Sequence, residues 1–514
     1  MRAIVLSVLG VFVLATPSVA AEPAKRPNIV LVLCDDLGYG DVGCLNPSGK
    51  IPTPNIDRLA AEGMIFTDVS SPSSVCSPTR YGIMTGRYAW RSKLKRGVLG
   101  GLSPRLIEPG RITIARFLRD NGYHTACIGK WHLGMDWQLE PGKTVTELGI
   151  EPREQVFNVR YDEPIRNGPN SLGFAHFFGI AASLDMVPYT FIENSRVTAN
   201  PTEDRDFVMM TGKQNRTRKG PAAPGFEAEN VLPELTKRAV GYIGERAKAA
   251  TPFFLYLPFA SPHTPTIPTK EWLGNSRLNA YGDFVMSTDA AVGAVLDALR
   301  AHGLETDTLV IFTSDNGCSP QADFPALAKL GHNPNYHFRG HKADIFEGGH
   351  RVPFIVRYPG KVKPGSKMDR LICLTDIYAT CAEIIGAKVP EDAAEDSFGF
   401  TSVWGDATDT PTRESMVVQS VDGSFAIRDG KWKLCLCAGS GGWSAPKPGK
   451  AEAGLPDVQL YDLKADIGET TKLHNQHPEI VEKLTKELEK IVANGRSTPG
   501  KPRKNTTPVK IRQK

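Results

Sequence analysis

The stretch NIVLVLCDD, residues 28–36, indicates the fold class. Residues 29–33 are all aliphatic, which is typical of a short strand buried on both faces of a parallel sheet. Four more apolar runs alternate with segments of helical periodicity, at His124–Gly129, Pro252–Phe259, Thr308–Thr313 and Pro353–Arg357. This alternation predicts an α/β fold, with a large and mostly parallel sheet sandwiched by helices.

Helix signals fill the segments between these runs. Thr53 can cap a first helix, Pro54 suits its first turn and Gly63 can end it. Periodicity predicts further helices over residues 113–121, 239–249, 284–302 and 375–386.

The pattern changes after about residue 400. Short strand-like segments separated by turn residues predict a small antiparallel sheet, at residues 415–420, 425–428, 432–436 and 459–462. A helix with apolar residues at helical spacing follows over 478–493. We therefore expect a main domain over 22–400, a smaller subdomain of antiparallel sheet plus helix over 401–495, and a tail over 496–514.

The N-terminus resembles an export signal. Arg2 precedes an apolar run over residues 3–15, and small residues at 17–21 offer a cleavage point. We expect a signal peptide over residues 1–21, export to the periplasm or the medium, and no stable membrane insertion after cleavage. The alternative, an N-terminal membrane anchor, is disfavoured because the run is short for a bilayer.

Composition and charge limit the class of partner. The chain has 514 residues, of which 41% are hydrophobic and 23% charged, which is the balance of a globular protein. The net charge is +5, but residues 496–514 contain seven bases and no acid. We expect this proline-containing tail to be disordered, so that the positive charge does not indicate a nucleic-acid partner. Adhesion of the tail to a polyanionic glycan is the alternative.

Polar residues follow the predicted strands and are expected to meet at the carboxyl edge of the sheet. These are Asp35-Asp36, Lys130-Trp131-His132, Ser261-Pro262-His263 and Asp315-Asn316-Gly317. Asp-Asp or Asp-Asn-Gly alone is more often a cap or a turn. Two such pairs at two strand ends predict an all-oxygen site for a hard divalent cation, Ca²⁺ or Mg²⁺.

The segment Cys76-Ser77-Pro78-Thr79-Arg80 resembles the C-x-P-x-R signature of the sulfatase family. The resemblance continues in the family's order over most of the chain, through Asp35-Asp36, GKWH at 129–132, His263, DNG at 315–317, KADIFEGGHRVP at 342–353, LYDL at 460–463 and GET at 468–470. It implies an alkaline-phosphatase-like fold and hydrolysis of sulfate monoesters. Thr79 and His341 depart from the usual pattern without removing a required group.

The resemblance also implies a cofactor chemistry. A formylglycine-generating maturation enzyme oxidises the family's cysteine, here Cys76, to formylglycine (3-oxoalanine), whose hydrate attacks sulfur. Calcium, in preference to magnesium, is held by Asp35, Asp36, Asp315, Asn316 and the modified residue at Cys76.

Further roles are carried over by the same resemblance. Arg80 and Lys130 orient the hydrate, and His132 is the base for breakdown of the sulfated residue. His263 and Lys342 contact the sulfate and its bridging oxygen, with His263 the better general acid near neutral pH.

Other interpretations of these residues stay open. Cys76 could be a thiolate nucleophile at a helix N-terminus with His132 or His263, although this leaves the carboxylates without a role. A tyrosine-phosphatase loop is excluded because Gly82 stands where its arginine is needed. A phosphate or phosphonate ester hydrolase on the same scaffold, and a non-catalytic binder of sulfated glycans, are the remaining alternatives.

The layout resembles the arylsulfatase and N-acetylgalactosamine-6-sulfatase branch. This implies a sulfated carbohydrate substrate, such as a glycosaminoglycan or an algal glycan. Loop residues that could contact it are Asp185, Tyr189, His332, His337 and Arg339.

Overall fold

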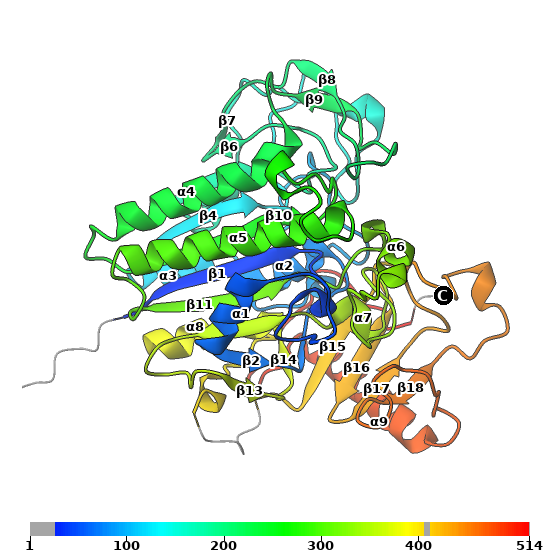
Figure 1. The fold of residues 1–514 in the computed structure, drawn as a ribbon. Helices are drawn as coiled ribbons and strands as arrows, with labels where there is room; N and C mark the ends of the chain where they lie inside the picture. Colours follow the sequence, from blue (N-terminus) through cyan, green and yellow to red (C-terminus); the bar gives the residue numbers. More distant parts are fainter. Residues whose placement is uncertain (1–25, 406–411, 513–514) are drawn as a thin grey trace, which may run out of the picture.

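The computed structural model describes residues 26–405 and 412–512, and the predicted signal peptide lies outside them. Its centre is a ten-stranded sheet (Figure 1). In spatial order the strands are β13 (Ser366–Met368), β2 (Met64–Phe66), β12 (Phe354–Arg357), β11 (Thr308–Ser314), β1 (Asn28–Asp35), β10 (Phe253–Pro262), β4 (His124–Lys130), β5 (His176–Ile180), β6 (Ile192–Glu193) and β7 (Arg196–Val197).

The central strands run parallel. β1 lies between β10 and β11, and Ile29 pairs with Phe254 on one side and Leu309 on the other. β4 and β5 continue the parallel arrangement, whereas β12 is antiparallel to β11. The prediction of a mostly parallel sheet is confirmed, and all five apolar runs form strands.

Helices cover both faces of the sheet. Alternate residues of β1 point to opposite faces, so each face of the strand belongs to a different apolar core. Val30 and Val32 share one apolar core with α1 (Pro54–Ala61), α4 (Val231–Arg246) and α5 (Ala280–Ala301). Leu31 belongs to the other core, with α2 (Cys76–Thr85), α3 (Ile114–Asp120) and α8 (Ile377–Ile385).

Two helices begin earlier than the periodicity predicted. Asn279 caps α5 by accepting hydrogen bonds from two backbone N–H groups, so the helix starts before Phe284. α4 starts at Val231 because Pro233 is tolerated in the first turn, where it removes no helical hydrogen bond.

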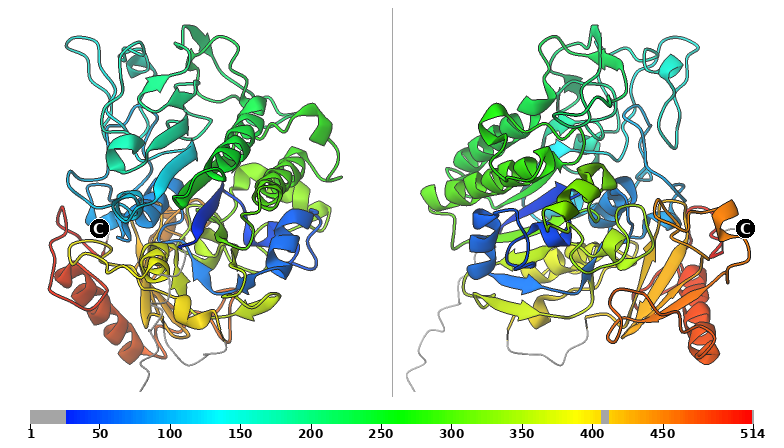
Figure 2. Two further views of the ribbon diagram at one scale, coloured as in Figure 1. Left: turned by 90° about the vertical axis from the view of Figure 1, so that its left-hand side faces the viewer. Right: turned by 45° about the vertical axis from the view of Figure 1, so that its right-hand side comes forward.

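The C-terminal unit is an antiparallel sheet with a helix beside it, as predicted (Figure 2). Its strands are β15 (Ser415–Gln419), β16 (Phe425–Asp429), β17 (Trp432–Cys435) and β18 (Gln459–Asp462). α9 (Pro478–Asn494) buries Leu484 and Leu488 in the core of this unit. The sequence did not predict β2, β5, β6, β7 and β13 of the main sheet. Other unpredicted elements are β3 (Val69–Ser70), β8 (Glu203–Arg205), β9 (Gly220–Ala222), β14 (Ile372–Cys373), α6 (Phe324–Lys329) and α7 (Glu347–His350).

The tail that the sequence predicts to be disordered makes defined contacts with the rest of the chain up to residue 512. Arg91 donates to the side-chain oxygen of Asn505 at 2.9 Å, and the backbone N–H of Thr506 donates to the Arg91 carbonyl at 2.8 Å. Val509 and Ile511 pack against the C-terminal core. These contacts use backbone groups and short side chains, and residue composition does not reveal such contacts.

All nine cysteines lie within the described residues and carry free thiols. In the same part of the chain, the model contains no helix that is both long and apolar enough to cross a bilayer.

Candidate active site

The carboxylates of β1 and β11 meet because the two strands end side by side. Cys34 pairs with Ser314 at the last position of the ladder, and the N–H of Asp315 donates to the Cys34 carbonyl at 3.1 Å. Asp36 adopts a left-handed backbone, with φ of 63°, which interrupts the alternation of the strand. Asp35 and Asp36 therefore both face the same site.

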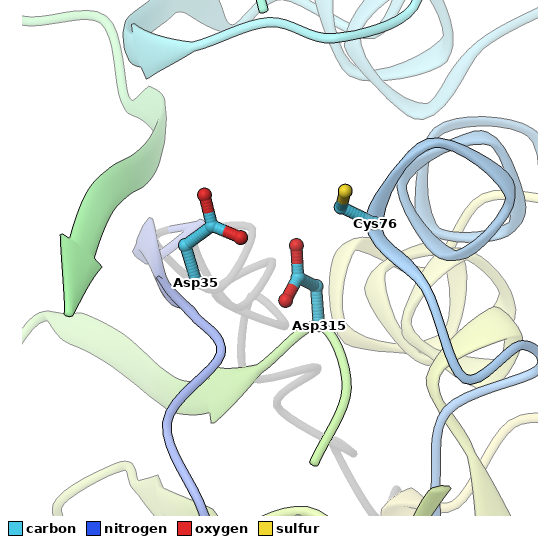
Figure 3. Close-up of side chains that lie close together, drawn as sticks. All are labelled: Asp35, Cys76 and Asp315. Atoms are coloured by element: carbon cyan, nitrogen blue, oxygen red, sulfur yellow. The ribbon is translucent and has the colours of Figure 1, made fainter. Parts of the chain in front are cut away.

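Cys76 and Arg80 come from α2. Cys76 is the first residue of the helix, and Arg80 follows one turn later on the same face. The Sγ of Cys76 and carboxylate oxygens of Asp35 and Asp315 all lie within 4.8 Å of one another. Figure 3 shows the sulfur facing the two carboxylates from across the site. The Nη2 of Arg80 lies 2.8 Å from Asp315 Oδ2, which fixes the helix to the strand end.

The remaining predicted cations are held by the same carboxylates. The Nζ of Lys130, at the end of β4, lies 2.5 Å from Asp35 Oδ2, and the Nζ of Lys342 lies 2.7 Å from Asp36 Oδ2. The Nε2 of His263 is 3.6 Å from Asp36 Oδ2. All these side chains are buried. The structure thus brings Arg80, Lys130, His263 and Lys342 to one centre.

Mutual charge sets the protonation of this centre. Burial alone would raise the pKa of Asp35, but the surrounding cations, Lys130 first, lower it. Burial would lower the pKa of Lys342, but Asp36 raises it. At Asp315, burial and then the charge of Asp35 raise the pKa to about 6. A further cation next to Asp315 would favour its ionised form.

The centre fits a divalent cation with oxygen ligands. Among the described residues, Asp35 Oδ1 and Asn316 Oδ1 are buried without a hydrogen-bond partner. The amide nitrogen of Asn316 donates to Asp36 Oδ1 at 2.7 Å, so its oxygen is the atom left over. Unfilled carboxylate and amide oxygens are ligands that Ca²⁺ accepts.

The imidazole of His132 is neutral and has one nitrogen without a partner among the described residues. Its Nε2 is 2.8 Å from the Leu99 carbonyl, an acceptor, so this nitrogen carries the proton. Its Nδ1 is buried and has no partner within the described chain. Burial and then Lys130 lower the pKa of His132 well below its ordinary value. The free lone pair on Nδ1 can therefore accept a proton.

Sequence reasoning missed the residues that position His132. The N–H of Leu99 donates to the Ser77 hydroxyl at 3.1 Å, so Ser77 fixes the loop whose carbonyl holds the imidazole. Leu99 acts through its backbone, which no side-chain pattern reveals. Ser77 lies inside the C-x-P-x-R segment, directly after Cys76, and this position was the one sequence feature that could have indicated its role.

Three of the five predicted substrate contacts have polar atoms that bond to the protein itself. His332 Nε2 lies 2.9 Å from Asp41 Oδ1, the Tyr189 hydroxyl is 2.9 Å from Thr217 Oγ1, and Arg339 Nη1 donates to the Glu469 carbonyl at 2.6 Å. His337 packs against Tyr336, with 3.9 Å between ring centroids. Asp185 Oδ1 is without a partner in the described part of the chain.

Comparisons with known proteins agree with this geometry. A family model described as Sulfatase matches residues 27–387. The N-acetylgalactosamine-6-O-sulfatase of Bacteroides thetaiotaomicron is 32% identical over 508 residues, covering 91% of this chain and 94% of that protein. Arylsulfatase A of Homo sapiens is 31% identical over 468 residues, covering 88% and 84%. A solved structure from work on glycosaminoglycan metabolism by Bacteroides thetaiotaomicron superimposes with a TM-score of 0.77 at 31% identity, covering 91% of this chain and 99% of that one.

Proposed function

Because this chain belongs to the sulfatase family and is a sulfatase, we propose that it removes sulfate from a sulfated carbohydrate through a formylglycine made from Cys76. The observation that carries the proposal is the meeting of the Cys76 sulfur with the carboxylates of Asp35 and Asp315 within 4.8 Å. A thiol in this place is a poor nucleophile, since burial raises the pKa of Cys76. Conversion to an aldehyde hydrate would replace it with a hydroxyl nucleophile.

The electrostatics support attack on a sulfate monoester, which is an anion. Asp35, Asp36, Asp315 and Asn316 would hold Ca²⁺, which supplies positive charge at the sulfate oxygens. Arg80 and Lys130 are already fixed by the same carboxylates, so they meet the substrate without reorganising.

Proton transfers are assigned to the two histidines. His263 and Lys342 both sit against Asp36, and we assign them to the sulfate and its bridging oxygen. His263 would protonate the departing alcohol. His132, neutral and with Nδ1 unpartnered, would take a proton from the hydroxyl group of residue 76 and so release sulfate.

A carbohydrate substrate is supported by the relative from Bacteroides thetaiotaomicron, which matches nearly the whole of both chains. We infer that this chain acts on a 6-sulfated amino sugar or a similar sulfated glycan. The N-terminal segment supports export to the periplasm or the medium, and Cys76 requires a formylglycine-generating enzyme as a transient partner.

The test is the mass of the tryptic peptide Leu59–Arg80 from protein made together with a formylglycine-generating enzyme. The aldehyde makes this peptide about 18 Da lighter, because one oxygen replaces sulfur and two hydrogens. The matured protein should release sulfate from N-acetylgalactosamine 6-sulfate at least about 1,000-fold faster than the Cys76→Ala variant. An unmodified thiol in protein from its own host, or faster release of phosphate than of sulfate from matched esters, would overturn the proposal.

A further inference from the structure

A hollow of about 400 Å³ opens beside the loop of residues 93–98. Leu148, Gly149 and Val421 form its other walls, and Leu148 exposes 41% of its surface. This volume is at the lower end of the range for ligand clefts. It offers room for a group the size of a sugar ring.

The charge of this hollow differs from that of four other hollows on the described surface. Its lining has three cations, Lys93, Lys95 and Arg96, and no acidic residue. Each of four other hollows includes at least one carboxylate beside its bases, for example Asp323 beside Lys213. The loop hollow is therefore the one among the five suited to an anion.

The cations at its rim are available to a ligand. Arg96 is exposed, and within the described residues its guanidinium has no hydrogen-bond or ion-pair partner. Lys93 has only Glu147 near it, at 4.0 Å, and the Glu147 side chain is 73% exposed. Such a surface pair is weak and easily exchanged for a ligand.

Lys95 lies deeper and reinforces the positive charge of the hollow. Its ammonium donates to the carbonyls of Trp90 at 2.5 Å and Thr507 at 3.4 Å. Burial and then the charges of Arg87 and Arg91 lower its pKa to about 8. The cations behind the loop thus add to the field that an incoming anion meets.

The backbone connects the hollow to the catalytic centre at two points, once along the chain and once through hydrogen bonds. Val98 is followed by Leu99, whose carbonyl holds the His132 ring. On the other side, the N–H of Gly97 donates to Val421 at 2.7 Å, and the N–H of Val421 donates to Ala343, next to Lys342, at 3.0 Å. The loop of the hollow and the segments that hold His132 and Lys342 are therefore neighbours in the fold.

We propose that the loop hollow, through Lys93 and Arg96, binds a second anionic group, a sulfate or a carboxylate, on the same glycan whose sulfate ester is being hydrolysed. The inference rests on the proposed function and deepens it, because it assigns the enzyme to polyanionic oligosaccharides rather than to singly charged sugars. Leu148 would cover an apolar face of the bound sugar.

Binding provides the first test. The probe is a hexasaccharide of alternating uronate and N-acetylgalactosamine 6-sulfate, titrated calorimetrically into full-length protein that carries Cys76→Ala to prevent turnover. Adding Lys93→Gln and Arg96→Gln should weaken Kd about tenfold and reduce the slope of log Kd against log salt by about one to two. The matched control is Lys237→Gln with Lys248→Gln, which removes two charges from the α4 region and should leave Kd unchanged.

Turnover provides the second test, with the matured enzyme. The ratio of kcat/KM for the hexasaccharide to kcat/KM for N-acetylgalactosamine 6-sulfate should fall at least about fivefold in the Lys93→Gln/Arg96→Gln variant. The ratio should not change in the Lys237→Gln/Lys248→Gln control. A hexasaccharide Kd equal to that of the control variant would overturn the inference. If the wild type released no sulfate from either compound, the proposed function would fail, whereas weakened binding would still support the anion site.

Discussion

Two clusters of charge in this protein have the same number of acids and of bases but differ in how closely these are paired. The catalytic cluster contains Asp35, Asp36, Asp315, Arg80, Lys130 and Lys342, and the interface cluster, between the main domain and the C-terminal sheet, contains Asp68, Glu347, Glu469, Arg351, Arg428 and Lys433. Each has three acids and three bases. Charge number alone therefore does not distinguish a functional site from a structural one.

The interface cluster has its charges closely paired: Glu469 Oε1 accepts no hydrogen bond, but it lies 2.9 Å from the Nζ of Lys433. Lys433 Nζ lies 3.0 Å from a Glu347 oxygen and 2.9 Å from a Glu469 oxygen, and Arg428 pairs with Asp68 at 2.7 Å. Every carboxylate has a cation in close contact, as buried charges require.

The catalytic cluster leaves acceptors unfilled. Asp35 Oδ1 has its nearest recorded cationic partner, Arg80 Nη2, at 3.7 Å, and Asn316 Oδ1 has no partner in the described chain. Buried polar atoms are nearly always paired with protein groups, water or ions, and Asp35 Oδ1 and Asn316 Oδ1 are acceptors of the kind that Ca²⁺ accepts. The comparison teaches that buried acceptors with no cation in close contact, rather than the amount of charge, mark the site.

The largest effect that tests this comparison is the removal of the cation. Treating the matured enzyme with a calcium chelator should lower the rate of sulfate release at least about 100-fold, and added Ca²⁺ should restore it. Ca²⁺ should also raise the thermal midpoint of the wild type, by preferential binding to the folded state.

The matched variants separate the two clusters. Asn316→Ala should abolish the shift of the thermal midpoint that Ca²⁺ produces, because it removes an unfilled oxygen. Glu347→Gln should keep that shift, since each carboxylate of the interface cluster already has a Lys or Arg side chain in close contact. A Ca²⁺-induced shift that survives Asn316→Ala unchanged would contradict the comparison.

A medium effect is expected from Glu347→Gln on stability. Removing this charge leaves Lys433 and Arg351 with less compensation, and the free energy of unfolding should fall by about 3 kcal/mol in chemical denaturation. Glu482→Gln, which removes an exposed carboxylate paired with Lys486, is the control and should leave the denaturation midpoint in place.

The same variant should show a defined pH dependence. Burial alone would raise the pKa of Glu347, but Lys433 and Arg351 lower it well below the ordinary value of 4.5. A depressed pKa in the folded state contributes stability above the unfolded pKa, and this contribution is lost as the pH falls. The gap in stability between wild type and Glu347→Gln should therefore narrow below about pH 4.5. A gap that stays constant down to pH 3 would show that the charge of Glu347 is not what stabilises the interface.

The sequence was sufficient for the parts of the molecule that depend on local pattern. The aliphatic run at 29–33 predicted a doubly buried strand, and the polar residues after it predicted the position of the site, because parallel strands end at one edge. The motif at 76–80 identified Cys76 and Arg80 by resemblance, and the structure places both at the start of α2.

The sequence was insufficient where polar residues have two possible roles. Tyr189, His332 and Arg339 have the chemistry of ligand contacts, yet each is used by the fold itself. Leu99 is the opposite case, since an apolar residue holds the base through its carbonyl. Such assignments depend on which groups meet in space, and spacing along the chain does not encode that.

The smallest expected effect on stability comes from the tail, which contacts a third set of buried charges, Arg91 and Asp396. Arg91 is paired with Asp396 at 2.8 Å, and Asn505 completes this pair by accepting from Arg91 while donating to the Val492 carbonyl at 2.8 Å. Asn505→Ala should therefore lower the free energy of unfolding by about 1 kcal/mol and speed tryptic cleavage of the tail.

Lys504→Ala is the matched control for this last effect, because Lys504 contacts Arg87 through its carbonyl and its side chain is not part of that hydrogen bond. This variant should keep the wild-type stability, and its tail should be cleaved at Arg503 no faster than that of the wild type. If Asn505→Ala behaved in the same way, the tail would contribute nothing to the Arg91 pair. A difference between the two variants would instead show that the basic, proline-containing tail is held in place by its contact with the Arg91–Asp396 pair. The tail would then complete this pair in the way in which we expect Ca²⁺ to complete the catalytic cluster.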